Sequence, residues 1–231
     1  MYGGGADEEL LAEALHPYPD GLLVTTKVGV ARSGPSGEWR LDGRPVVLCD
    51  QVEQALRRLR VERLELLQLH RVDPETSLAD QLGALRHLQA EGKIGRIGLS
   101  EVTVDELRQA GEIVDLASVQ NRYNLLDREH EPVLAACEEA GSRSCRGVLS
   151  PGGNPARGPG SPQWRPSSKP RRRRSRSPGS STTRRSSSRP GTARVDYLEE
   201  NLAAERLQLT RAHRERLDQI PDLAQGTPSY R

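Results

Sequence analysis

Phenylalanine is absent from this chain of 231 residues, which contains a single methionine and three cysteines. The cysteines, Cys49, Cys137 and Cys145, have neither paired nor metal-ligand spacing. We therefore expect no disulfide framework and no metal site, in a reducing compartment such as the cytoplasm. No apolar run approaches the roughly 18 residues that a membrane helix needs, and MYGGGADEE is not a signal peptide. These absences argue against a disulfide-rich secreted protein and a membrane-spanning one.

Acidic residues are missing from one long stretch, residues 142–189. This segment holds twelve Arg and one Lys, and 38 of its 48 residues are Arg, Ser, Pro or Gly. Such a composition buries too little apolar surface to offset the entropy of ordering it, so we predict a disordered segment. The rest of the chain carries 21 basic and 32 acidic groups. The chain is a mildly acidic globular sequence with a basic insert.

Outside this segment, short apolar runs alternate with amphipathic stretches. The runs predict strands at residues 22–28, 64–69, 94–99 and 116–120. Helices are expected to begin near residues 7, 50, 78, 103, 132, 195 and 210. The pairs Asp50 with Glu53 and Thr103 with Glu106 have capping-box spacing, and residues 31–45 form a long polar loop. Four or more alternations of strand and helix predict a parallel sheet with helices outside it.

Groups of complementary acid-base type occur at strand or loop ends: Tyr2, Lys27 and His70. Ligands collect at the carboxyl ends of parallel strands, so His70, which directly follows the strand at 64–69, is a candidate for proton chemistry. The alternative is a histidine that is simply hydrogen-bonded in a strand-to-loop turn. Tyrosine has an unperturbed pKa of about 10, and a neighbouring ammonium would lower it enough to make the phenol a usable acid.

Several phrases of the sequence together resemble the aldo-keto reductases, and most of all bacterial members of the pyridoxal-reductase type. The phrases are YGGGADEELLAEAL, VTTKVG, ELLQLHRVDP, EGKIGRIGLSEV, SVQNRYNLLDRE and PGTARVDYLEENLAA. The resemblance covers residues 2–141 and 190–209. It implies a (β/α)8 barrel of the aldo-keto reductase type. It also implies hydride transfer between a nicotinamide cofactor, NADPH, and a small aldehyde or ketone.

Carried over by position, the resemblance makes Tyr2 the general acid, Lys27 the group that lowers its pKa, and His70 the residue that orients the carbonyl group. The family pattern has an aspartate five residues before the tyrosine, a position that would precede Met1. Glu101 stands where an asparagine is frequent.

The resemblance also implies a set of cofactor contacts. Ser100 and Gln120 match the positions that bind the nicotinamide carboxamide. The loop that holds the 2′-phosphate and the positions near the adenine match Gly191, Thr192, Arg194, Glu200 and Asn201. Since that loop opens a helix, its amide groups favour phosphate whatever its side chains are.

The resemblance divides the chain into four regions: a partial barrel at 1–141, the basic segment at 142–189, barrel helices with the phosphate loop at 190–220, and a tail at 221–231. The sequence begins after the first two strands of the family pattern, and the basic segment replaces the seventh strand, seventh helix and eighth strand. The segment's 48 residues are close to the roughly 40 that the missing part needs. We infer that it is the right DNA read in the wrong frame, and that the chain as written is impaired as an enzyme.

Two alternatives have no catalytic role. In the first, the Arg/Ser-rich segment is a genuine arm that binds RNA or another polyanion through phosphate charge. Only Trp164 in it could stack on a base, which argues against nucleic acid. In the second, the chain is an inactive barrel remnant. The sequence implies no particular carbonyl substrate and no oligomeric state.

Overall fold

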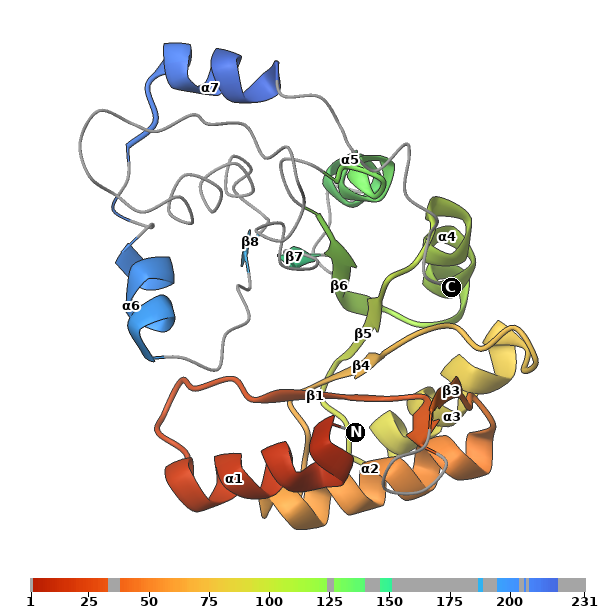
Figure 1. Ribbon diagram of the computed structural model, residues 1–231. Coiled ribbons are helices and arrows are strands. Elements are labelled where there is room, and N and C mark those ends of the chain that lie inside the picture. Colours follow the sequence, from red (N-terminus) through yellow and green to blue (C-terminus); the bar gives the residue numbers. More distant parts are fainter. Residues whose placement is uncertain are drawn as a thin grey trace. The chain divides into compact units, whose positions relative to one another are not determined.

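The structure is a computed structural model, and it divides into two compact units (Figure 1). The first unit is residues 1–119 with 140–145, and the second is residues 120–139 with 146–231. The structure describes residues 2–32, 38–123, 127–139, 146–150, 187–188, 195–203, 206 and 208–219, without the side chains of residues 2, 3, 32, 146–150, 187, 188 and 200. Within these ranges, no helix is long and apolar enough to cross a membrane.

A parallel sheet organises the first unit. Strand β1 (Thr25–Val28) pairs with β4 (Leu66–Leu69), and β4 pairs with β5 (Ile97–Ser100), both in parallel. The next strand along the chain is β6 (Leu116–Arg122), whose first residues belong to this unit. The predicted parallel sheet is confirmed. The order of its strands follows the chain, because the helix after each strand returns the chain to the end of the sheet at which the next strand begins.

The helices of the first unit succeed one another along the sheet. A short 3-10 helix η1 (Tyr2–Gly5) leads into α1 (Ala6–Leu15), which packs on α2 (Pro45–Leu59). Helix α2 packs on α3 (Leu78–Ala90), and α3 packs on α4 (Val104–Ile113) (Figure 1). Fully buried leucines and isoleucines fill the space between helices and strands: Leu48, Leu59, Leu67, Leu69, Leu82, Leu85, Ile94, Ile97 and Leu99.

Helix α4 begins at its predicted capping box, and helix α3 ends next to a glycine. Helix α4 has a complete capping box, in which the Thr103 hydroxyl accepts from the backbone of Glu106 and the Glu106 carboxylate accepts from the backbone of Thr103. Helix α3 is followed by Gly92, whose φ of 82° is one that only glycine adopts easily.

The first predicted strand is shorter than expected. The run at 22–28 was expected to be buried throughout, but β1 begins only at Thr25, and Leu22 and Leu23 are 44% and 52% exposed. The reason is pairing: Thr25 lies opposite Leu66, the first residue of β4, so the residues before it have no strand to bond to.

The prediction of a polar loop at 31–45 was also wrong. It contains β2 (Val30–Arg32) and β3 (Trp39–Leu41), which pair as an antiparallel hairpin. Each strand has three residues, too few to establish an alternating pattern among the surrounding Gly and Pro.

The start expected for the second helix was likewise wrong. Helix α2 begins at Pro45, five residues before the predicted cap at Asp50, because a proline at the first helical position already has the required φ. Asp50 lies inside the helix, where its carboxylate accepts from Gln54 Nε2 at 2.6 Å.

The second unit contains the end of β6, helices α5 (Glu131–Glu139), α6 (Val195–Ala203) and α7 (Arg211–Asp218), and the parallel strands β7 (Arg146–Ser150) and β8 (Ser187–Ser188). These three helices confirm the stretches predicted from periodicity. Both short strands fall inside the segment 142–189, which was predicted to lack regular structure. The other residues of that segment lie outside the described residues, so its disorder and its RNA binding stay predictions.

Candidate active site

Lys27 and His70 lie at the same edge of the sheet, on neighbouring strands. In the register of β1 and β4, Lys27 is opposite Gln68 and Val28 is opposite Leu69. The backbone N–H of His70 donates to the carbonyl oxygen of Val28 at 2.9 Å, which continues this ladder one residue beyond β4. Because the strands are parallel, their carboxyl ends meet at one edge, and the ammonium and imidazole groups are brought there together.

The His70 ring is neutral at pH 7. Burial, followed by the positive charges of Lys27 and Arg71, lowers its pKa from 6.5 to about 4. Burial and nearby cations both disfavour the imidazolium form. A neutral imidazole carries one N–H, so His70 can donate one hydrogen bond to a carbonyl oxygen while it stays uncharged.

Ser100 is the corresponding residue on the next strand. Leu69 of β4 lies opposite Leu99 of β5, so Ser100 follows at the level of His70. The serine is 2% exposed. The next residue, Glu101, has a φ of 54°, and its carboxylate forms an ion pair with Arg71 at 3.7 Å. This ion pair joins the residues that directly follow His70 and Ser100.

A polar row crosses the sheet below this edge. Gln68, at the level of Lys27, is 1% exposed, and its Nε2 donates to the Ser118 hydroxyl at 3.2 Å. Ser118 belongs to β6 and is also buried. The row connects β4 to β6 across β5, and therefore fixes the strands that carry the site.

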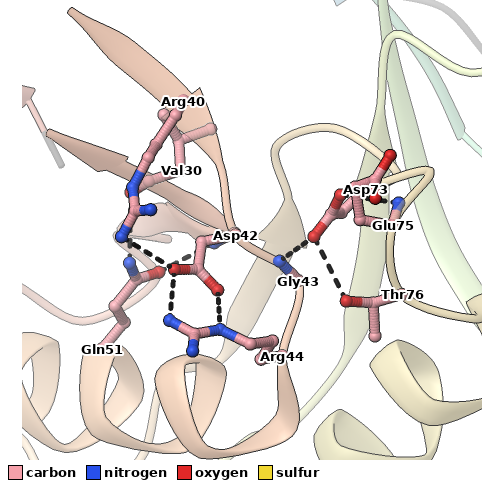
Figure 2. A network of polar contacts seen from close by, with 10 residues as sticks. Val30, Arg40, Asp42, Gly43, Arg44, Gln51, Asp73, Glu75 and Thr76 are labelled. Atoms are coloured by element: carbon pink, nitrogen blue, oxygen red, sulfur yellow. Dashed lines mark hydrogen bonds and ion pairs between the residues drawn. The ribbon is translucent and has the colours of Figure 1, made fainter.

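Buried carboxylates hold the two loops that follow β1 and β4 (Figure 2). Asp73 accepts from the backbone of Gly43 at 2.7 Å and from the Thr76 hydroxyl at 3.2 Å. Asp42 accepts from the Arg44 guanidinium at 2.8 Å, and this hydrogen bond holds the pKa of Asp42 below its usual range. The hairpin β2–β3 is thereby tied to the loop after His70, which stabilises this edge of the sheet.

Most of the remaining predicted residues are outside the described residues, either entirely or in their side chains. Tyr2 is in η1, but its side chain lies outside the described residues, and so does that of Glu200 in α6. Gly191, Thr192 and Arg194 also lie outside the described residues. Gln120 and Asn201 belong to the second unit. The Oε1 atom of Gln120 is buried and, among the described residues, finds no hydrogen-bond partner.

Glu8 is one of the buried polar residues in this part of the fold that were not singled out from the sequence. It lies in the first turn of the helix expected to begin near residue 7, is 4% exposed and accepts from the hydroxyl of Thr26. No local signal distinguishes it from its neighbours Asp7 and Glu9, which are exposed.

Comparison with known proteins gives the family. The model of the aldo/keto reductase family matches residues 1–149. The chain belongs to the aldo/keto reductase family. An uncharacterized oxidoreductase of Schizosaccharomyces pombe is 40% identical over 212 residues, which are 90% of this chain and 68% of that protein. The pyridoxine 4-dehydrogenase of Escherichia coli is 31% identical over 61% of this chain and 51% of its own length.

The fold agrees with that of solved aldo-keto reductases. The holo form of an aldo-keto reductase from Bacillus halodurans superposes with a TM-score of 0.80 over 97% of this chain and 81% of that chain, at 20% sequence identity. The predicted (β/α)8 barrel of the aldo-keto reductase type is therefore confirmed for the part of the barrel that this chain contains. The chain spans about half the length of its Escherichia coli relative.

Proposed function

We propose that this aldo-keto reductase reduces small aldehydes or ketones with NADPH, using Tyr2 as the general acid. The observation that supports this most is the pairing of β1 with β4, which brings Lys27 and a neutral His70 to one edge of the sheet. A cation beside an uncharged imidazole suits a reaction in which a carbonyl oxygen gains negative charge and then a proton.

Each residue has a separate task in this proposal. The Lys27 ammonium lowers the pKa of the Tyr2 phenol from its ordinary value of about 10, because a neighbouring positive charge favours the phenolate. Tyr2 gives its proton to the carbonyl oxygen as that oxygen becomes an alkoxide. His70 donates its N–H to the same oxygen and holds the carbonyl group in line.

The cofactor NADPH would supply the hydride when bound. Its nicotinamide carries a carboxamide, which has both a donor and an acceptor. In the second unit, the buried Oε1 of Gln120, which has no partner among the described residues, could accept from such a donor. In the first unit, the Ser100 hydroxyl stands at the edge where His70 lies. We propose Gly191, Thr192 and Arg194 for the 2′-phosphate, and Glu200 and Asn201 for the adenine.

The test is NADPH oxidation by the purified chain with a panel of small aldehydes. We expect slow turnover, because we infer that residues 142–189 replace the seventh and eighth strands of the family pattern. Tyr2→Phe should reduce the rate by at least about a hundredfold, because general acid catalysis is lost. Tyr18→Phe is the matched control: Tyr18 donates to the Leu59 carbonyl at 2.9 Å, so its loss affects stability and leaves the chemistry intact. Equal rates in wild type and Tyr2→Phe would contradict the proposal.

A further inference from the structure

Glu8 is a buried carboxylate that the proposed chemistry does not use. It lies in the first turn of α1, three residues after Gly5, the last residue of η1. Its Oε1 accepts from the Thr26 hydroxyl at 2.5 Å, and Thr26 is the neighbour of Lys27 on β1. A single carboxylate therefore joins the segment that carries Tyr2 to the strand that carries Lys27.

Arg58 of α2 completes this connection. Its Nη1 forms an ion pair with Glu8 Oε2 at 3.3 Å, and its Nη2 donates to Gln54 Oε1 at 2.8 Å. The guanidinium also lies directly against the backbone of Gly5: a Cβ at Gly5 would be 2.5 Å from Arg58 Nε. Gly5 has a φ of 106°, which glycine adopts more easily than other residues, and Arg58 packs against it at this turn of the chain. The end of η1 is thus held by α2 as well as by β1.

We infer that Glu8, together with Arg58, is a positioning residue for the reductase chemistry: it fixes the turn that carries Tyr2 relative to the strand that carries Lys27. This inference rests on the proposed function. The lowering of a phenol pKa by an ammonium depends on the distance between the two charges, because Coulomb energy falls with separation. A contact that sets this distance sets the acidity of Tyr2. Among the described residues, the other charged or titratable groups at this edge include His70 and Arg71 of the β4 loop and Glu101 after β5.

The chain offers a matched pair of substitutions on one strand. Thr26→Val keeps the shape of the side chain and removes the hydroxyl that donates to Glu8. Thr25→Val makes the same chemical change one residue earlier, at a hydroxyl that is buried and unpartnered within the described residues. Thr26→Ser keeps the hydroxyl. A second pair tests the same contact if the valine variant does not fold: Glu8→Gln, with the exposed neighbour Glu9→Gln as its control.

The measurement is the titration of Tyr2 in the full chain labelled with ¹³Cζ-tyrosine, with the signal assigned by its loss in Tyr2→Phe. We expect Tyr2 of the wild type to titrate below about 10. Thr26→Val should raise that value by about one unit, and both Thr26→Val and Glu8→Gln should reduce kcat about tenfold, with an unchanged KM for NADPH. Thr25→Val, Glu9→Gln and Thr26→Ser should change neither value. Thermal unfolding of each variant separates these effects from lost stability.

The outcomes separate this inference from the function it rests on. If Thr26→Val leaves the Tyr2 titration at the wild-type value, if Glu8→Gln leaves kcat at the wild-type value, or if Tyr2 titrates normally in the folded wild type, the positioning role is wrong. If the titration shifts as expected but the wild type oxidises no NADPH, the positioning role holds and the proposed function fails.

Discussion

Burial and nearby positive charges both lower the pKa of His70, so its imidazole is neutral at pH 7. Burial disfavours the imidazolium, and so do the charges of Lys27 and Arg71, which bring its pKa to about 4. The residue types at the site were predictable from the sequence, since Lys27 and His70 each stand at the end of an apolar run. The burial of Glu8 was not, because its contacts with Thr26 and Arg58 join residues far apart along the chain.

The neutral His70 predicts a pH dependence of stability. The unfolded chain binds a proton at His70 near pH 6.5, whereas the folded chain does so only near pH 4. Between these values the unfolded state holds more protons, so the free energy of unfolding decreases as the pH falls. His70→Gln removes this contribution and should flatten the decrease. Urea unfolding of both proteins between pH 7 and pH 4.5 measures it, and identical slopes would show that His70 is not buried as described.

The loops at the carboxyl edge depend on a close approach between two elements. Gly43, which precedes α2, donates to Asp73 in the loop after β4, and a Cβ at Gly43 would lie 2.5 Å from Gln81 Oε1 and 2.7 Å from Asp73 Cβ. Gln81 is fully buried and donates to the carbonyl oxygen of Asp73 at 2.9 Å. No side chain can be added there without moving this network.

Gly43→Ala should therefore destabilise the fold by about 1–3 kcal/mol, the usual cost of overpacking a buried site. Gly83→Ala in α3 is the control: a Cβ there meets no atom within 4 Å, so alanine should stabilise the helix by about 0.5–1 kcal/mol. Guanidinium unfolding of the two variants should move the midpoint in opposite directions. A stable Gly43→Ala protein would mean that the two loops do not pack as described.

Elements with complete local signals were predictable, whereas a hairpin of three-residue strands and a strand start set by pairing were not. Helices α3 and α4 carry their own start or stop residues, Gly92 and the Thr103–Glu106 box. The hairpin β2–β3 and the start of β1 depend on partners elsewhere in the chain. The start of α2 was missed because the capping spacing at Asp50 was preferred to Pro45, although proline is common at a first helical position.

At the scale of the whole molecule, the family match stops where the composition changes. The family model ends at residue 149, eight residues into the Arg/Ser-rich segment. The Schizosaccharomyces pombe relative nevertheless aligns over 90% of this chain, which requires the alignment to cross the segment. An alignment that continues on both sides of the segment is what we expect if the codons between are read out of frame.

The coding DNA tests that hypothesis. Translation of the two other frames across residues 142–189 should show apolar strand-like runs around an amphipathic helix, and replacing the segment with that translation should raise turnover well above that of the chain as written. If neither frame contains such runs, the Arg/Ser-rich segment is genuine. Its binding to generic RNA at increasing salt would then become the relevant measurement.

The most direct test of the central claim follows the hydride itself. The chain is mixed with NADPH deuterated at the transferred position and a small aldehyde, and mass spectrometry counts the deuterium in the alcohol product, so that slow turnover is sufficient. We expect deuterium at the former carbonyl carbon with the wild-type chain, and its loss in Tyr2→Phe and Lys27→Met. Absence of deuterium with the wild type, or equal incorporation by Tyr2→Phe, would contradict it.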